Sequence, residues 1–580
     1  MYVLGLSCFY HDSAACLLKD GVVIAAAQEE RFTRKKHDFS YPENAVSFCL
    51  KEAGIEARYL SYVAFYEKSF VKFDRILSTH ISVAPLGIAS FLKSIPLWVR
   101  QKMWISSIIR KKLNYKGRII FPEHHEAHAA STFFCSPFSE AAIITLDGVG
   151  EWSTTTCGYG QGKRIYLQKE ICFPHSLGLL YSAFTYFLGF KVNSGEYKVM
   201  GLAPYGRPQY YDLILDKLIE VKEDGSFRLN LEYFSFVHGL KMTGRRFEKA
   251  LGRSKRKKES RLTQDDFDVA ASIQKVTEEV VLRIARFARK ETGMKNLCLA
   301  GGVALNCVAN GKVLREAGFD DIYIQPAAGD AGGAIGAATL AYYSVLNKAR
   351  EEPVMPHAYL GPQYSDQEVQ SALDQCGATY HKHSQPELIK RTAKLIADQN
   401  VIGWFQGRME FGPRALGGRS ILADARDSKM KDKVNLKIKF RESFRPFAPT
   451  VLYEHVNEYF ELNRESPYML LVAQVRENKR IIPAVTHVDG SARIQTIKRE
   501  DNPLYYDLIK EFHQLTGVPV IINTSFNVRG EPIVGSPRDA YNCFMGTNMD
   551  YLVIGNYVLD KNEQKNKKAF ENWHETFPLD

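Results

Sequence analysis

Three histidines lie close together in the segment PEHHEAHAA, residues 122–130. If this segment is helical, His124 and His128 are one turn apart and lie on the same face of the helix. That spacing suits two nitrogen ligands of one metal ion. The segment also fits the partly exposed start of a helix, because Glu123 and Glu126 are favoured near its positive end. An HxxxH pattern is common, so this stretch alone leaves both interpretations open.

Basic side chains gather in three glycine-rich or proline-containing segments of the C-terminal third. These segments are GRMEFGPRALGGRS (407–420), KFRESFRPFAP (439–449) and INTSFNVRGEPIV (522–534). Their arginines stand among small and rigid residues, unlike the basic run SKRKK at 254–258, which we expect to be an exposed loop. The planar fork of arginine matches phosphoryl and carboxylate groups. The three segments therefore predict a pocket for such anions.

Two glycine-rich turns follow short apolar runs that predict strands. Residues 296–299 lead into Gly301 and Gly302, and residues 322–325 lead into the turn GDAGGA, with Asp330 at its tip. Glycine lets a ligand approach the backbone, and the start of the following helix offers free N–H groups. This arrangement is typical of a phosphate or adenosine site, although tight glycine turns also occur for packing alone.

The elements that must position these residues occur in two similar series. Each series has three predicted strands separated by a polar loop and a tight turn: 2–6, 14–18 and 22–27 in the first, and 141–146, 153–159 and 164–171 in the second. The loop after the first strand carries His11 and Asp12 in one series and Asp147 in the other. The repetition suggests an internal duplication whose units face one another across a nucleotide. Two unrelated hairpins are the alternative.

The length of the chain, 580 residues, predicts two or more domains. Residues 267–291 predict a helix that ends near Gly293, and the proline-rich stretch 351–361 resembles a linker. We therefore expect one domain at 1–355 and a second at 364–580.

The composition narrows the class of protein. A hydrophobic content of 45% with 24% charged residues is ordinary for a globular chain, and the net charge of +11 is modest for this length. That charge is compatible with anionic small substrates or with weak nucleic-acid contact. Ten scattered cysteines without a C-x-x-C motif argue against a zinc ribbon and a disulfide scaffold, and favour a reducing compartment.

The chain shows neither a signal peptide nor a convincing membrane span. Its first residues, MYVLGLSCFYHDSAACLL, lack a positive leader. Residues 83–99 are the most membrane-like segment, but Pro85, Lys93 and Pro96 interrupt it and it is short for a span. We expect a cytoplasmic protein in which this segment is a buried or partner-facing helical hairpin.

Ten motifs in this order resemble the O-carbamoyltransferases that carbamoylate nodulation factors and antibiotics such as aminoglycosides and cephems. The motifs are YHDSAA, EERFTRKKH, HHEAHAAS, TLDGVGEW, SGEYKVMGLAPYG, LAGGVALN, GDAGGAIGAA, FGPRALGGRS, FRPFAP and NTSFNVRGEPIV. Each is moderately specific, and together they cover nearly the whole chain. The resemblance implies an α/β protein with an N-terminal duplicated domain of the actin-like ATPase superfold, similar to threonylcarbamoyl-transfer proteins, and a C-terminal YrdC-like α/β domain.

The resemblance implies a metal site formed by His124, His128, Asp147 and Asp330. Members of the family look like iron proteins, and two imidazoles with two carboxylates can also hold manganese, magnesium or zinc. His125 is expected to be a neighbour of the ligands.

A reaction in two halves is also implied by the resemblance. Carbamoyl phosphate and ATP, the expected co-substrates, form carbamoyl-adenylate in the C-terminal domain and release pyrophosphate. A hydroxyl of a small molecule then attacks this adenylate in the N-terminal domain. The expected carbamoyl phosphate site contains Arg414, Lys439, Arg445, Asn523 and Arg529, and the expected ATP or adenylate site contains Lys36, Gly301, Gly302, Asn306, Asp330 and Gly333.

Two residues are candidates for catalysis. His11 is the candidate general base, because a histidine near its ordinary pKa accepts a hydroxyl proton at neutral pH. Asp12 either orients this histidine or caps a turn. Lys36 suits a phosphate or carbamoyl oxygen, with an ordinary surface lysine as the alternative.

Three other functions are compatible with parts of the pattern. Modification of tRNA is disfavoured by the modest charge and by the presence of both domains on one chain. Carbamoylation of a protein cysteine is disfavoured by the missing C-x-x-C zinc motifs and acylphosphatase-like part. A regulator without catalysis is disfavoured by the intact His11, Asp330 and Arg414. The expected partner is a small-molecule hydroxyl acceptor, with no nucleic acid or membrane and with a homodimer as a family-level expectation; residues 65–116 and 234–261 are expected to select the acceptor.

Overall fold

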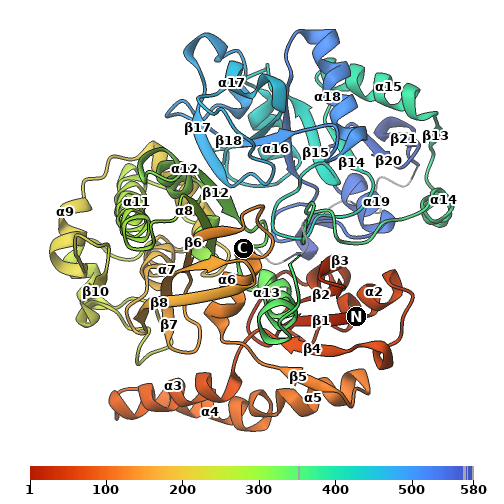
Figure 1. Cartoon of the computed structure of the whole chain (residues 1–580). Helices are drawn as coiled ribbons and strands as arrows, with labels where there is room; N and C mark the ends of the chain where they lie inside the picture. Colours follow the sequence, from red (N-terminus) through yellow and green to blue (C-terminus); the bar gives the residue numbers. More distant parts are fainter. Residues whose placement is uncertain (351–352, 566–569, 571–572, 578–580) are drawn as a thin grey trace. The chain divides into compact units, whose positions relative to one another are not determined.

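The computed structural model describes residues 1–350, 353–565, 570 and 573–577 (Figure 1). The chain divides into two compact units: unit 1 comprises Met1–Glu29 and His37–Pro356, and unit 2 comprises Glu30–Lys36 and His357–Asp580. The division after Pro356 falls inside the predicted linker 351–361, of which residues 351 and 352 lie outside the described residues. The assignment of residues 30–36 to unit 2 was not predicted.

The first sheet of unit 1 has five strands in the order β3-β2-β1-β4-β5. The first three strands form an antiparallel meander, and β4 and β5 continue the sheet parallel to β1. The strands span Tyr2–Ser7 (β1), Ala14–Lys19 (β2), Val22–Gln28 (β3), Tyr62–Phe65 (β4) and Arg118–Ile120 (β5). The three strands predicted from the first series are confirmed.

The second sheet of unit 1 repeats this strand order as β8-β7-β6-β11-β12. An antiparallel meander of β6, β7 and β8 is again extended by two strands parallel to the first. The strands span Glu140–Leu146 (β6), Ser153–Gln161 (β7), Arg164–Cys172 (β8), Asn296–Ala300 (β11) and Asp321–Ile324 (β12). The second predicted series and the two strands before the glycine turns are therefore present.

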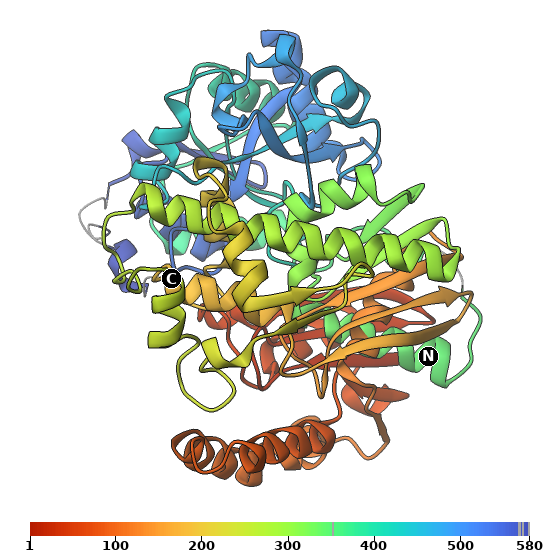
Figure 2. The same cartoon turned by 90° about the vertical axis from the view of Figure 1, so that its left-hand side faces the viewer.

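Helices α6 (His124–Phe133) and α13 (Gly333–Leu340) pack against each other in unit 1. The first contacts β6 and β11 of the second sheet, and the second contacts β1, β2 and β4 of the first. Their approach is close, because a methyl group added at Gly336 would lie 1.7 Å from the carbonyl oxygen of Ala127. The predicted long helix is α11 (Gln264–Thr292), which contacts β6 and β7 and ends at Gly293 (Figure 2).

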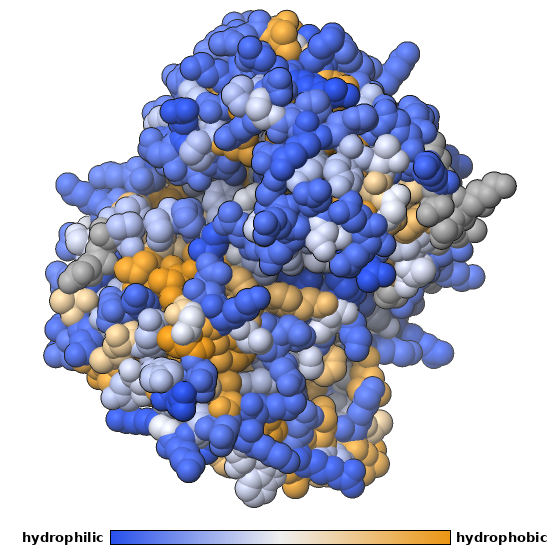
Figure 3. Space-filling view, turned by 90° about the vertical axis from the view of Figure 1, so that its right-hand side faces the viewer, coloured by the Kyte–Doolittle hydropathy of each residue, from blue (hydrophilic) through white to orange (hydrophobic). Residues whose placement is uncertain are grey.

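A pair of helices projects from unit 1 at its lower end in Figures 1 and 2: α3 (Ser69–Ser82) and α4 (Ile88–Arg100), followed by α5 (Ile105–Leu113). The prediction that residues 83–99 are buried is wrong, because Ile88 and Leu92 of α4 are 64% and 65% exposed. A partner for this face stays a prediction. In Figure 3, apolar side chains lie among hydrophilic ones at this end of unit 1. Within the described residues, no helix has the length and apolar character to cross a membrane.

The remaining elements of unit 1 lie in its connections. They are α2 (Glu43–Glu52), α7 (Leu177–Phe187), α8 (Glu196–Leu202), α9 (Tyr211–Leu213), β9 (Ile219–Val221), β10 (Phe227–Leu229), α10 (Arg245–Ala250) and α12 (Cys307–Glu316). The predicted exposed loop at 254–258 needs a correction. Arg256 in its middle is buried and donates a hydrogen bond to the carbonyl of Leu188 at 2.9 Å, so it ties the loop to the protein.

Unit 2 is built on a mixed sheet of nine strands in the order β13-β21-β20-β14-β15-β19-β16-β18-β17. In that order they span His381–Lys382, Tyr557–Asp560, Tyr551–Ile554, Ile402–Phe405, Arg419–Asp424, Val520–Ser525, Ala448–Leu452, Ser491–Ile497 and Leu471–Gln474. Its helices are α1 (Glu30–Thr33), α14 (Asp366–Gln375), α15 (Gln385–Ala397), α16 (Met430–Lys437), α17 (Val456–Tyr459), α18 (Pro503–Thr516) and α19 (Pro537–Met545). Trp404, Tyr505 and Phe512 fill the core between the sheet and helices α15 and α18.

Candidate functional site

Two buried histidines of α6 face the same point in unit 1. The helix begins at His124, where a capping box satisfies its first turn: the Glu126 carboxylate accepts a hydrogen bond from the backbone N–H of Glu123 at 2.8 Å. Because His124 and His128 are one turn apart, their Nε2 atoms lie 3.0 Å from each other. Both histidine side chains are 1% exposed, whereas Glu123 before them is 52% exposed, so the helix start is exposed only on its glutamate side.

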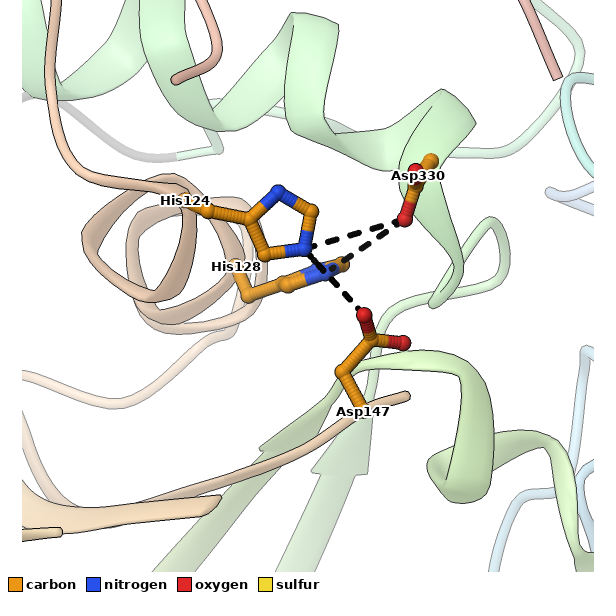
Figure 4. A group of neighbouring side chains, drawn as sticks. All are labelled: His124, His128, Asp147 and Asp330. Atoms are coloured by element: carbon orange, nitrogen blue, oxygen red, sulfur yellow. Dashed lines mark hydrogen bonds and ion pairs between the residues drawn. The ribbon is translucent and has the colours of Figure 1, made fainter. Parts of the chain in front are cut away.

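Two carboxylates complete this group (Figure 4). Asp147 follows β6 and places Oδ2 3.2 Å from Nε2 of His124. Asp330 precedes α13 and places Oδ1 3.8 Å from Nε2 of His124 and 3.9 Å from Nε2 of His128. The four ligand atoms all lie within 4.8 Å of one another. Two nitrogens and two oxygens that converge in this way fit a divalent transition metal, and metal binding by this cluster stays a prediction.

The pKa shifts of the four cluster residues favour the binding of a cation. Burial lowers the pKa of both His124 and His128, so both imidazoles are neutral, which is the form that coordinates a metal. Burial and the nearby Asp147 charge raise the pKa of Asp330 to about 7, whereas the histidines outweigh burial and hold the pKa of Asp147 below its usual range. A divalent cation at this point favours the ionised form of both carboxylates.

His11 lies beside the cluster, with Nε2 3.8 Å from Oδ2 of Asp330. Its Nδ1 is 3.2 Å from Oδ2 of Asp12, and the other oxygen of Asp12 is 2.8 Å from Nδ1 of His37. Asp12 therefore orients two imidazoles. Burial lowers the pKa of His11, but Asp330 and Asp12 outweigh it and raise this pKa to about 10. His11 can act as a base at neutral pH only when the charge of these carboxylates is compensated.

The loop that carries His11 is held in an unusual backbone conformation. Phe9 and Asp12 have φ angles of 76° and 53°, in the left-handed region that residues other than glycine rarely adopt; His37, on the loop after α1 that contacts Asp12, has a φ of 57°. The loop is fixed by a hydrogen bond of 2.7 Å from the backbone N–H of Phe9 to the carbonyl of Phe39. Strain of this kind is typical of functional sites.

The glycine turns position the cluster. The backbone N–H of Gly302 donates a hydrogen bond of 2.8 Å to Oδ1 of Asp147. At Gly301, φ is 94° and a methyl group would lie 2.2 Å from the carbonyl oxygen of Leu146. A methyl group at Gly333 would lie 2.8 Å from the ring of Tyr66. These glycines have packing roles, and nucleotide contact by them stays a prediction.

Asn306, another residue predicted to bind the adenylate, has its amide engaged within the protein. Its side chain caps α12 by accepting a hydrogen bond of 3.1 Å from the N–H of Ala309. The same amide exchanges two hydrogen bonds, of 3.0 and 3.1 Å, with the amide of Gln274.

Three charged residues near the cluster were missed by the sequence reasoning. Glu67 lies 3.9 Å from Nδ1 of His124 and forms an ion pair of 2.5 Å with Lys72; both partners are 1% exposed. Glu151 accepts a hydrogen bond of 3.0 Å from the backbone N–H of His124. Their place in the sequence could have indicated one of them, because Glu67 lies two residues after the end of β4, much as Asp147 directly follows β6.

Unit 2 holds the predicted anion-binding residues around the C-terminal end of β19. Lys439 is buried, and its ammonium donates to the carbonyls of Ser525 and Asn527 at 2.5 and 2.8 Å and to the side chain of Asn527 at 2.7 Å. The backbone N–H of Arg529 donates to the carbonyl of Lys439 at 3.2 Å. Burial, with nearby Arg441, lowers the pKa of Lys439. Lys439 therefore organises the turn that presents Arg529.

The other residues of the predicted anion site differ in their burial and in their hydrogen bonds within the protein. Asn523 is fully buried, and its amide donates to the carbonyl of Ala415 at 3.2 Å, which ties β19 to the turn that carries Arg414. Arg414, Arg445 and Arg529 are partly buried. Arg419, which also stands in the first basic segment, has no exposed surface and donates to four backbone carbonyls, so it supports the fold.

Lys36 ends the segment 30–36 that belongs to unit 2, and its side chain is partly buried. The neighbouring Arg34 fixes this segment to the same unit by donating to Oε1 of Glu531 at 2.6 Å and to the carbonyls of Pro532 and Ile533 at 2.9 and 2.7 Å. A catalytic role of Lys36 stays a prediction.

Family models decide the relationship that the motifs suggested. The model described as carbamoyltransferase N-terminus matches residues 2–339, and the model described as carbamoyltransferase C-terminus matches residues 393–561. The chain belongs to the carbamoyltransferase family. This carbamoyltransferase is 40% identical to nodulation protein NolNO of Sinorhizobium fredii, over 95% of this chain and 79% of that protein. It is 41% identical to nodulation protein NolO of Bradyrhizobium diazoefficiens, over 78% of this chain and 80% of that protein.

Two further similar proteins do not indicate a function for this chain. An uncharacterized protein of Synechocystis is 53% identical over the full length of both chains. Among solved structures, full-length HypF in a phosphate- and nucleotide-bound form is 13% identical with a TM-score of 0.33, covering 59% of this carbamoyltransferase and 55% of that chain. Similarity at that level carries no argument about fold or activity.

Proposed function

We propose that this carbamoyltransferase hydrolyses carbamoyl phosphate to carbamate and phosphate and joins the carbamate to the α-phosphate of ATP with release of pyrophosphate. The carbamoyl group of the resulting carbamoyl-adenylate is then transferred to a hydroxyl of a small molecule. The observation that carries the proposal is the convergence of His124, His128, Asp147 and Asp330 beside His11 in unit 1. Unit 2 contributes the basic group around Arg414 and Arg529. The separation of the two groups between two units supports a reaction in two halves.

Unit 1 is the proposed transfer domain. Its two sheets have the same strand order and the same pairing senses, which supports a duplicated domain of the actin-like ATPase type that binds the adenylate. The turn at Gly302 donates its backbone N–H to Asp147 of the cluster, so a glycine turn of the kind found at phosphate sites lies next to the proposed metal ligands. A bound divalent cation, iron by the family resemblance with manganese or magnesium as alternatives, would supply positive charge for the adenylate phosphate.

The transfer step follows from the position of His11. Asp12 engages Nδ1, so Nε2 is the nitrogen that takes the proton of the acceptor hydroxyl. The hydroxyl oxygen bonds to the carbamoyl carbon, the bond between that carbon and the phosphate oxygen breaks, and AMP leaves with the electron pair. His11 keeps the proton until it returns to solvent.

Unit 2 is the proposed adenylate-forming domain of the YrdC type. Arg414, Arg445 and Arg529 supply guanidinium groups for the phosphoryl oxygens of carbamoyl phosphate and ATP. Lys439 and Asn523 hold the turns that carry two of these arginines. We further propose a cytoplasmic enzyme with a small-molecule acceptor and without a nucleic-acid or membrane partner.

Mass spectrometry of reactions with ATP, carbamoyl phosphate and a panel of hydroxylated metabolites tests the proposal. Wild-type protein should form AMP, pyrophosphate, inorganic phosphate and an acceptor heavier by one carbamoyl group. His11→Asn should lose ~10²–10⁴-fold in transfer and accumulate carbamoyl-adenylate. Arg414→Ala should form no adenylate from carbamoyl phosphate, yet transfer from supplied carbamoyl-adenylate. Equal loss of both activities in both variants would overturn the division into two halves.

A further inference from the structure

A cavity of about 760 Å³ lies in unit 1 beside the loop that carries His11. Phe9 and Tyr10, the two residues directly before His11, form one wall, residues 39–44 form a second, and α4 with α5 closes it. This volume is in the range of small-molecule binding sites. None of the four cluster residues lines the cavity, so it is a separate space next to the proposed base.

The walls of the cavity offer flat apolar faces. The rings of Phe9, Tyr10, Phe39 and Tyr41 line it. Phe9 and Phe39 stand on two loops joined by the hydrogen bond of 2.7 Å between their backbones, so the distance between these walls is fixed. Aromatic faces arranged in this way contact the faces of sugar rings and of planar rings.

One lysine of the cavity has no acidic partner. Lys102 places its ammonium 3.8 Å from the centre of the Tyr10 ring and 5.3 Å from the Trp98 ring, and within the described part of the chain it forms no ion pair. The hydroxyl of Tyr41 is buried and has no hydrogen-bond partner among the described residues. The ammonium of Lys102 thus remains available to a ligand, whereas the buried Tyr41 hydroxyl does not.

The other charged residues of the cavity have partners within the protein. Lys112 forms an ion pair of 2.8 Å with Glu43 at the exposed rim. Glu29 accepts hydrogen bonds from the side chain of Asn44 at 2.6 Å and from the backbone N–H of Ala45 at 2.8 Å. These donors are neutral, so Glu29 keeps its negative charge, but this residue is only 2% exposed. The charge that the cavity presents to a ligand is that of Lys102, and it favours an anion.

We propose that this cavity binds the hydroxyl acceptor and that the acceptor is a ring-containing anion. Its carboxylate, phosphate or sulfate pairs with Lys102, and its ring lies against the exposed ring of Phe39. His11 does not itself line the cavity, so the bound acceptor extends past Tyr10 to bring its hydroxyl to His11, the next residue of the loop. The acceptor role rests on the proposed function, whereas binding of a ring-containing anion does not.

Two matched probes test the binding step on the full-length protein by calorimetry. The probes are p-nitrophenyl β-D-glucuronide and p-nitrophenyl β-D-glucoside, which differ in one carboxylate. Wild-type protein should bind the glucuronide about tenfold or more tightly, since a hydrogen bond to a charged group contributes that much. Lys102→Gln should lose this preference, and Lys111→Gln, an exposed neighbour outside the cavity lining, should keep it. Equal binding of both probes by wild type, or a preference that survives in Lys102→Gln, would overturn the proposal.

A second experiment tests the acceptor role separately from the adenylate. Ile108→Trp fills the cavity and should block transfer while adenylate formation continues at the wild-type rate. If Ile108→Trp does not fold, Phe39→Ala at the 60%-exposed rim should raise the acceptor KM several-fold instead. Unchanged transfer by the folded variant would remove the cavity from the reaction. A wild-type protein that forms no adenylate but still prefers the glucuronide would contradict the proposed function and leave the binding site standing.

Discussion

At the scale of single residues, the candidate metal site depends on positions far apart in the chain. His124 and His128 share helix α6, whereas Asp147 follows strand β6 and Asp330 precedes helix α13. The two carboxylates need compensating charge: the two neutral imidazoles supply none, and protonated His11 beside Asp330 supplies at most one charge, which it shares with Asp12. A cation therefore satisfies four side chains at once, which is a stronger argument than the HxxxH spacing alone.

Removal of the two histidines should remove the metal. Purified protein should hold about one divalent ion per chain, and His124→Ala combined with His128→Ala should lose it, because only two carboxylates remain. Elemental analysis by mass spectrometry measures the content. His125→Gln is the matched control, since His125 bonds to Thr145 at 2.5 Å and stands outside the cluster, and it should retain the ion. Full metal content in the double variant would exclude this site.

The pH dependence of anion binding should report on Lys102. Burial and the charge of Lys72 lower the pKa of Lys102 to about 8, while Glu67 and Cys8 oppose the shift and the Tyr10 ring faces the ammonium. The charged form is lost as pH rises through this pKa, so glucuronide affinity should fall between pH 7 and pH 9. Binding titrations across that range measure it.

The rescue variant for this prediction is Lys102→Arg. A guanidinium stays charged throughout the range, so its glucuronide affinity should stay level up to pH 9. A fall of the same size in wild type and Lys102→Arg would assign the pH dependence to another group.

At the scale of elements, alternating apolar patterns predicted the strands well, and the residues that follow each strand were the useful clue to the site. His11 was proposed as the base from its position after the first strand, Asp147 was assigned as a ligand through the family resemblance, and both roles stay predictions. Glu67 follows β4 in the same manner but was missed, because β4 was not predicted in its own right. Lys102 was beyond reach, since its significance depends on the absence of an acidic partner, which only the folded chain reveals.

The close contact between α6 and α13 should be sensitive to a single methyl group. Gly336→Ala places that group 1.7 Å from the carbonyl oxygen of Ala127, so α13 must move from the helix that carries His124 and His128. Overpacking of this kind costs about 1–3 kcal/mol of stability. Thermal unfolding should show the loss, and elemental analysis should show a lower metal content.

Gly54→Ala separates these two effects. Gly54 has a φ of 63° but no atom within 4 Å of an added methyl group, so the variant strains a distant turn without moving α6. It should lower thermal stability and retain the metal. Metal retention in Gly336→Ala at a similar loss of stability would show that the helix contact does not position the histidines.

At the scale of the whole molecule, the chain length and the proline-rich stretch predicted two domains, but they did not predict that residues 30–36 belong to unit 2. The chain passes between the units after Glu29, after Lys36 and after Pro356. The contacts that assign residues 30–36 to unit 2 lie some five hundred positions away, as between Arg34 and Glu531. Neither periodicity nor composition reports a contact of that separation, so the exchange required the structure.

Arg34 should be the residue that keeps this segment on unit 2. Its guanidinium pairs with Glu531, which is 1% exposed and whose pKa burial raises to about 7, and it also donates to two carbonyls. Arg34→Ala leaves a buried carboxylate without its cation, which costs about 3–5 kcal/mol. The segment should then detach, and chymotrypsin should cleave after Phe32 faster than in wild type. Lys35→Ala, at the exposed neighbouring position, should leave the cleavage rate unchanged.

A compensating variant distinguishes the charge effect from a loss of packing. Glu531→Gln in the Arg34→Ala background removes the uncompensated charge, so it should recover part of the stability without restoring the hydrogen bonds of Arg34 to the two carbonyls. Cleavage after Phe32 should therefore stay faster than in wild type while the thermal midpoint rises. Identical cleavage in Arg34→Ala and Lys35→Ala would show that other side chains hold the segment, and the exchange would then not depend on this ion pair.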